Sequence, residues 1–169
     1  MTDPHDCPGC AVPDLAFAAH DHAQCTQDAL DRAEALTRTA GARMTPVRRR
    51  VLEILLEEHK ALGAYDVLAR LATEGFGNQP PVAYRALEFL VDQGLAHRIQ
   101  RLNAFAACAH VGEDHAPAFL ICRSCHMVAE TAATAARSSL DAEAARAGFR
   151  VERSTIEALG ICPGCQGAS

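Results

Sequence analysis

The sequence predicts an α+β fold in two parts, and three observations support this fold class. Apolar residues recur at helical spacing through most of residues 28–94. Two short alternating segments follow at residues 95–99 and 105–107, as expected for a β-hairpin. Two Cys-x-x-Cys pairs then lie among further strand and helix patterns. We therefore expect a helical unit that ends in a hairpin, followed by an α/β unit held together by cysteines.

The first two expected helices are marked by their ends. The apolar period begins near Asp28, and Gly41 follows it as a helix stop. Thr45 and Pro46 begin the second helix, because a capping residue followed by proline at the first helical position is a typical helix start.

Two more helices are expected before the hairpin. The third covers about residues 64–74, and the fourth runs from Pro80 until Gly94. Helices followed by a two-stranded wing form a winged helix-turn-helix, in which the helix before the wing reads DNA.

The C-terminal part has a different pattern. Strands are expected at residues 118–121 and 127–129, around the first cysteine pair. An alanine-rich helix covers residues 132–147, and another strand lies within 149–159. This order predicts a small α/β domain.

The chain therefore divides into four segments. Residues 1–27 are acidic, contain several Pro and Gly, and are expected to form a flexible arm. Residues 28–108 form the winged-helix domain and residues 109–117 a hinge. Residues 118–169 form the C-terminal domain.

Charge distribution permits a nucleic-acid partner despite the net charge of −5. Residues 1–30 hold five Asp and no Lys or Arg, whereas residues 31–101 hold eleven basic and nine acidic side chains. The cationic excess thus lies in the expected DNA-binding domain, mostly as Arg, which suits phosphate and base edges. No run of about 18 apolar residues and no signal peptide is evident, so we expect a cytoplasmic protein without a membrane partner.

The two Cys-x-x-Cys pairs predict a structural zinc site. Eight cysteines in a cytosolic chain favour metal binding over disulfides. Two such pairs complete a closed tetrahedral shell with no open position for catalysis. A redox pair and coincidental free thiols are the alternatives, but a redox pair is expected at a thioredoxin-like helix start, which is not seen. The expected ligands are Cys122, Cys125, Cys162 and Cys165.

A second, mixed set of ligands spans the two domains. His97 and Cys108 fall on the two strands of the wing, His115 in the hinge and Glu130 after the first cysteine pair. Taken singly, His97 could be a histidine without a ligand role, and Cys108 could be a small buried hydrophobic residue. Together, a thiolate, two imidazoles and a carboxylate suit zinc, or cobalt as a surrogate, and a metal held by all four would fix the angle between the domains.

Several motifs make the chain resemble the ferric uptake regulator (Fur) family, and within it the zinc uptake regulator branch. Residues 44–52 read M-T-P-V-R-R-R-V-L and are similar to the family's L-T-P-x-R-x-x-V-L. Residues 63–68 (G-A-Y-D-V-L) and 80–90 (P-P-V-A-Y-R-A-L-E-F-L) resemble S-A-Y-D-L-L and P-P-T-V-Y-R-A-L-D-F-L. The resemblance covers about residues 30–165. Two departures, at Gly63 and at residues 82–83, bear on DNA affinity rather than on the family.

The resemblance implies a function and assigns the sites. It implies a zinc-responsive repressor that binds palindromic operators as a zinc-loaded homodimer, through a C-terminal dimerisation domain, and controls zinc uptake genes. It implies two zinc ions per chain: a structural one on the four cysteines, and a regulatory one on the mixed set, where Cys108 favours zinc over iron or manganese. The residues expected at the DNA are Arg48, Tyr65, Tyr84 and Arg85.

Two other functions compete with this one. A regulator of the same fold that responds to iron, or to peroxide through Cys108 oxidation, is one alternative. A zinc-dependent hydrolase with Glu130 as base is the other, but neither an H-E-x-x-H nor a deaminase signature is present. We therefore expect a protein that is not an enzyme and has no small-molecule substrate.

The sequence does not assign roles to several further histidines and cysteines. Those of the arm are either incidental or form an additional, weaker zinc site. His110 and His126 are either secondary ligands or merely exposed. The arm residues are His5, Cys7, Cys10, His20, His22 and Cys25.

Overall fold

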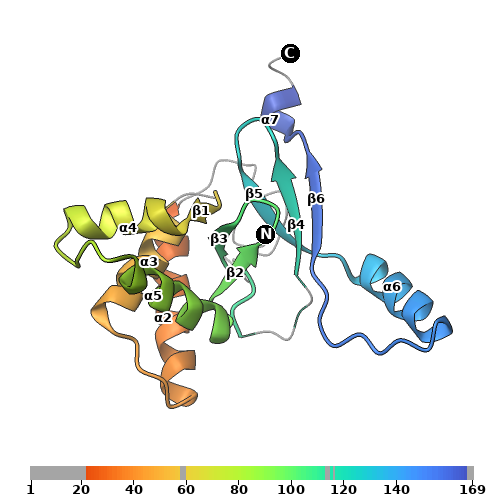
Figure 1. The fold of residues 1–169 in the computed structure, drawn as a ribbon, viewed down its shortest axis with the longest axis horizontal. Helices are drawn as coiled ribbons and strands as arrows, with labels where there is room; N and C mark the ends of the chain where they lie inside the picture. Colours follow the sequence, from red (N-terminus) through yellow and green to blue (C-terminus); the bar gives the residue numbers. More distant parts are fainter. Residues whose placement is uncertain (1–21, 58–59, 113–114, 116, 167–169) are drawn as a thin grey trace, which may run out of the picture.

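The computed structural model describes residues 22–57, 60–112, 115 and 117–166. A helical unit with a small sheet lies beside a second sheet, and one helix stands away from that second sheet (Figure 1). No helix in these ranges is long and apolar enough to cross a membrane.

Four helices build the N-terminal unit, in the predicted order. They are α2 (His22–Thr39), α3 (Pro46–Leu56), α4 (Ala64–Thr73) and α5 (Pro80–Asp92). The first begins at His22, ahead of the expected start near Asp28. The helix extends toward the N-terminus beyond the apolar period because residues 22–27 contain no Pro or Gly. Adding residues to the end of an existing helix costs little free energy.

Apolar side chains from all four helices form one core. The Thr45 side chain accepts the Arg48 backbone N–H at 3.4 Å and so caps α3, as its sequence predicted. Because this core fixes the helices relative to one another, it presents α5 on a rigid support. Its fully buried members include Ala33, Val51, Ile54, Val67, Leu71, Ala83, Leu87, Leu90 and Leu95.

The predicted hairpin forms and gains a third strand. Strands β2 (Ala96–Ile99) and β3 (Ala104–Ala107) are antiparallel, and β1 (Leu62–Gly63) pairs with the other side of β3. The sheet order is therefore β1-β3-β2. Two residues are too few to show an alternating pattern, so the sequence did not predict β1.

The C-terminal sheet has the order β5-β4-β6. Strand β4 (Pro117–Cys122) pairs antiparallel with β5 (Val128–Ala132) and parallel with β6 (Ile156–Gly160). The parallel crossover contains α6 (Thr134–Arg146), which has no buried residue and stands away from the sheet (Figure 1). A short helix, α7 (Pro163–Gln166), follows β6.

The wing packs directly against the C-terminal sheet. Ile99, on β2, forms a buried cluster with Phe119, Ile121 and Val128. At the wing tip, the Glu157 carboxylate of β6 accepts backbone N–H groups of the turn. These contacts place β2 and β3 next to β5, where the mixed ligand set meets.

Candidate metal centres

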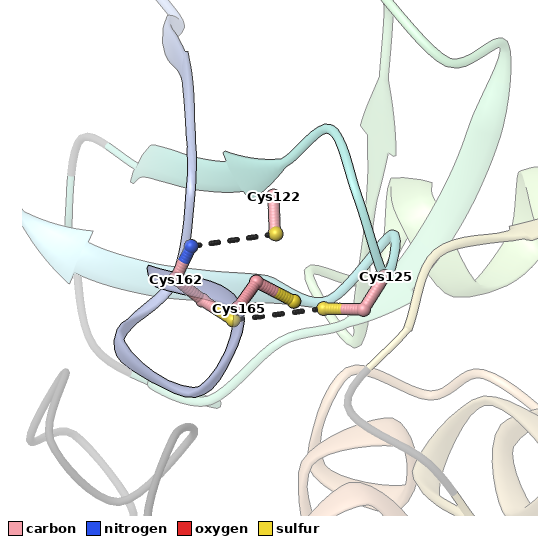
Figure 2. A group of neighbouring side chains, drawn as sticks. All are labelled: Cys122, Cys125, Cys162 and Cys165. Carbon is pink, nitrogen blue, oxygen red and sulfur yellow. Dashed lines mark hydrogen bonds between the residues drawn. The ribbon is translucent and has the colours of Figure 1, made fainter. Parts of the chain in front are cut away.

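The four-cysteine cluster lies at one end of the C-terminal sheet. Cys122 ends β4 and Cys125 follows in the turn before β5, whereas Cys162 and Cys165 lie after β6 and in α7. Because β4 and β6 run parallel, with Cys122 opposite Gly160, the two pairs leave the sheet at the same end. Figure 2 shows the four sulfurs turned toward one another.

The geometry of these thiols fits a tetrahedral zinc ion. The four Sγ atoms all lie within 4.8 Å of one another, and Cys125 Sγ is 3.7 Å from Cys162 Sγ. A tetrahedron with Zn–S bonds of about 2.3 Å has edges of about 3.8 Å. Cys122 Sγ also accepts the Cys162 backbone N–H at 3.3 Å. The residues present therefore fit zinc.

The pKa values of two of these thiols shift in opposite directions. Backbone N–H groups of Cys125 and Cys162 stabilise the Cys122 thiolate and lower its pKa to about 6. The hydrogen bond with the Cys162 side chain raises the pKa of Cys165 to about 12. Four adjacent thiolates need a cation, because like charges in contact suppress each other's ionisation.

The mixed ligand set draws on both units. His97 lies on β2, Cys108 directly follows β3, and Glu130 is on β5. His115 lies in the connecting segment between the two sheets. One ligand atom from each of the four lies within 4.8 Å of the others, so the structure brings together all four predicted residues.

The Glu130 carboxylate is the centre of this group. Its Oε1 lies 2.7 Å from His115 Nε2 and 3.1 Å from His97 Nε2, and its Oε2 accepts the Ala109 N–H at 2.8 Å. Burial raises the pKa of this carboxyl, but the nearby His97 imidazole and the Ala109 N–H outweigh burial and lower the pKa to about 2. Glu130 is thus a buried carboxylate with imidazole groups near one oxygen and a backbone N–H at the other.

The donors of the mixed set also fit zinc. Cys108 Sγ is 3.6 Å from His115 Nε2, which matches the separation of about 3.6 Å between S and N ligands of a tetrahedral zinc. Within the described residues, His97 Nε2 is buried and lacks an aligned hydrogen bond. Its close neighbour, Glu130 Oε1, is itself a predicted ligand, and a metal bound by both groups would satisfy the nitrogen.

The predicted DNA-contacting residues fall into two groups. Tyr65, at the start of α4, is 68% exposed, and Tyr84 and Arg85 are exposed on α5. The Arg48 guanidinium instead lies 3.6 Å from the Phe89 ring centroid and donates to the Arg43 carbonyl at 2.6 Å. Three of the four are therefore accessible to DNA, and Arg48 is engaged by its own domain.

The structure also shows where two histidines lie whose roles the sequence did not assign. His110 is only 7% exposed and lies beside the mixed set, so the interpretation of an exposed side chain is wrong for it. His126 is exposed in the first cysteine turn. His5, Cys7, Cys10 and His20, with the side chains of His22 and Cys25, lie outside the described part of the chain.

Comparison with known proteins identifies the family. The model of the ferric uptake regulator family matches residues 39–159. The chain belongs to this family. The zinc uptake regulation protein of Escherichia coli (strain K12) is 34% identical over 142 residues, which are 83% of this chain and 82% of that protein. The zinc uptake regulation protein of Shigella flexneri matches to the same extent.

Two solved structures agree with the fold. A zinc uptake regulator complexed with zinc and DNA is 33% identical, covers 85% of this chain and 96% of its own, and superimposes with a TM-score of 0.81. Holo XcZur is 34% identical over 82% of this chain and 99% of its own, with a TM-score of 0.72. The predicted fold class and the predicted family are both confirmed.

Proposed function

We propose that this Fur-family protein is a zinc-responsive, DNA-binding transcriptional repressor. It binds palindromic operators as a zinc-loaded homodimer and controls genes of zinc uptake and homeostasis. The observation that carries the proposal is the convergence of His97, Cys108, His115 and Glu130 between the two units. The likeness to a zinc uptake regulator complexed with zinc and DNA supports it.

Two zinc ions per chain have separate roles in this proposal. The first is bound by Cys122, Cys125, Cys162 and Cys165, and it stabilises the C-terminal domain by joining the ends of β4 and β6. The second binds the mixed set and is regulatory. The histidines and cysteines of residues 1–27 provide at most an additional, weaker site.

The regulatory site acts by fixing the relative position of two domains. The DNA-binding domain covers residues 28–108, the hinge 109–117 and the dimerisation domain 118–169. Two ligands come from the wing and one from β5, so zinc binds more tightly to the arrangement in which these elements meet. Only this difference in affinity shifts the population toward the DNA-binding arrangement.

The exposed residues of α4 and α5 provide the DNA contacts. Helix α5 enters the major groove, where Arg85 contacts a base edge or a phosphate. Tyr84 and Tyr65 make phosphate or thymine-methyl contacts beside it. Arg48 lies beside this surface and supports it through Phe89.

The dimer forms through the C-terminal domain. Four large apolar side chains are exposed there and are available for burial in an interface. They are Leu120, Leu140, Phe149 and Leu159. A symmetric dimer places two α5 helices on successive half-sites of an operator in the cytoplasm.

Of the two alternative functions, the hydrolase is set aside and the response to iron or peroxide is tested. The family consists of regulators, so the zinc-dependent hydrolase is not supported and the protein is not an enzyme. Response to iron or peroxide stays an outcome of the test. Against peroxide, Cys108 is only 3% exposed, whereas redox-sensing thiols are accessible.

The decisive experiment counts zinc per chain while free zinc is buffered from very low to moderate. The samples are the intact chain, Cys108→Ala, and a chain lacking residues 1–21, which leaves α2 whole. Each is tested for binding to its own promoter DNA with zinc, ferrous iron or peroxide. We expect one zinc to survive strong buffering, and a second to be lost with Cys108 together with DNA binding. Zinc loading and DNA binding by Cys108→Ala equal to those of the intact chain would refute the regulatory site.

A further inference from the structure

We propose that His110 is a fifth functional member of the mixed-ligand centre. It acts as a positioning residue that holds the Glu130 carboxylate for the metal. The inference rests on the proposed regulatory site and adds a residue to it. Nothing in the spacing of the four ligands requires a histidine at this position.

The first observation is the environment of the His110 side chain. It is 93% buried, and within the described residues its Nδ1 has no hydrogen-bond partner. That nitrogen lies 3.5 Å from Glu130 Oε1. The His110 ring also contacts the His115 ring, with centroids 5.1 Å apart and planes inclined at 44°. A buried, unpaired imidazole nitrogen directed at a ligand oxygen indicates a role at that oxygen.

The second observation is the convergence on a single carboxylate. Three imidazoles approach Glu130 Oε1, from His115 at 2.7 Å, His97 at 3.1 Å and His110 at 3.5 Å. Ala109, the residue before His110, donates its N–H to Oε2. Consecutive residues of the hinge therefore act on both oxygens of the same side chain.

Geometry favours a positioning role over direct ligation. The four predicted ligands form a group in which every ligand atom lies within 4.8 Å of the others, and His110 is not part of it. Four donors already complete the usual tetrahedral zinc shell. A carboxylate oxygen that binds a metal keeps a lone pair for a hydrogen bond, and such partners orient the ligand. His110 Nδ1 lies 3.5 Å from Oε1 without a hydrogen bond in the metal-free structure, and a small rotation of either side chain would let its N–H supply that bond.

The backbone after His110 is anchored, so its ring cannot easily turn away. Val111 packs against the core of the N-terminal unit. Gly112 has φ +89°, and a Cβ there would lie 3.2 Å from Leu36 Cδ1 of α2. A side chain at this position would be strained by the positive φ and would crowd Leu36, so glycine favours this close approach. The hinge is therefore held on α2, with His110 directed at the metal centre.

The test compares three substitutions in the full-length chain. His110→Leu keeps bulk but removes the donor. His110→Asn places an amide N–H at the position of Nδ1, and His110→Gln places it at the position of Nε2. The measurements are the affinity for the second zinc, by competition with a chelating indicator, and the visible spectrum of the cobalt-loaded protein. The control is His126→Asn, at an exposed histidine whose φ of +61° asparagine tolerates.

We expect His110→Leu to bind the second zinc about 10–100-fold more weakly, the usual cost of losing a group that orients a ligand. The cobalt spectrum should keep its four-coordinate form. His110→Asn should recover most of the affinity, and His110→Gln should not. If His110→Leu loses its structural zinc or its fold, the comparison of His110→Asn with His110→Gln still shows whether Nδ1 contributes to zinc affinity.

Other outcomes overturn the inference. Unchanged affinity in His110→Leu, or equal affinities of the Asn and Gln variants, would show that Nδ1 does nothing for the metal. A changed cobalt spectrum would make His110 a ligand instead of a positioning residue. Cys108→Ala, measured alongside, separates the two proposals. If it still loads the second zinc, the regulatory site itself is wrong; if it does not, a normal His110→Leu refutes only the role of His110.

Discussion

Glu157 of β6 accepts the backbone N–H of Gln100 at 2.7 Å, and its other carboxylate oxygen accepts that of Arg101 at 2.9 Å. One side chain of the C-terminal sheet thus binds two consecutive N–H groups at the tip of the wing. The contact lies beside the buried cluster around Ile99. Part of the domain arrangement is therefore held by protein contacts alone, without a metal.

Glu157→Ala should release the wing tip. Hydrogen bonds to a charged acceptor are stronger than neutral ones, but this site is exposed, so we expect a loss of about 1 kcal/mol and exchange roughly fivefold faster at the two amides. Amide hydrogen exchange at Gln100 and Arg101 measures this directly. Glu152→Ala, which removes an exposed partner of Arg150, is the control. Equal protection in Glu157→Ala and the parent chain would show that the contact does not form in solution.

Arg85→Ala and Arg48→Ala should affect DNA binding in different ways. Arg85 is exposed on α5. If it contacts a base, its loss should weaken DNA binding by about 1–3 kcal/mol; if it contacts a phosphate, its loss should reduce the slope of DNA affinity against salt concentration by about one. Arg48 stacks on Phe89, so its loss should cost about 1 kcal/mol of folding stability. DNA titrations at several salt concentrations and thermal unfolding of both variants distinguish these effects. A purely DNA-binding defect in Arg48→Ala would contradict the structural role.

Glu130→Gln should separate metal binding from folding. The amide oxygen still accepts the Ala109 N–H, but the charged ligand is lost, so affinity for the second zinc should fall more than about 100-fold. Because His97 and the Ala109 N–H lower the pKa of Glu130, they stabilise its carboxylate in the folded state, so the metal-free Glu130→Gln protein should be somewhat less stable than the parent chain. Thermal unfolding with and without excess zinc shows both effects, since only a bound metal raises the midpoint. The exposed Glu143→Gln on α6 should behave like the parent chain.

Cys162→Ser should unfold the C-terminal domain. Structural zinc contributes on the order of 10 kcal/mol in small zinc domains, which exceeds what three short strands and an unburied helix supply. We expect loss of the zinc that survives strong buffering, together with loss of protected amides in β4 and β6. Arg123→Ala, at an exposed position of the first cysteine turn, is the control. A folded, dimeric Cys162→Ser protein would mean that the four-cysteine site is dispensable for the fold.

Much of the architecture was predictable because it is encoded locally. Thr45 and Pro46 specify the start of α3 through side-chain and ring chemistry, and the structure shows the helix beginning there. The pairing of the wing strands follows from their alternation and the short turn between them. The two cysteine pairs are chelating by spacing alone, so their meeting required only that β4 and β6 leave the sheet at the same end.

The remainder depends on contacts between distant segments. Strand β1 exists because Leu62 and Gly63 find the free edge of β3, which no pattern in two residues reveals. His110 faces Glu130 because the hinge is held on α2, and neighbours in sequence do not determine that. The family resemblance places Arg48 beside the DNA-binding surface, but no pattern in the sequence shows that Phe89 lies under its guanidinium.

Helix α6 has a consequence for how such a protein would respond in a cell. Within one chain it buries none of its residues, and Leu140 on its surface stays 45% exposed. An isolated helix of this length is marginal in water, so we expect association with a second copy of the chain to stabilise it. Folding of this region and dimer formation then become one equilibrium governed by mass action. The amount of protein present would act as a second input beside zinc, and dilution alone would weaken repression.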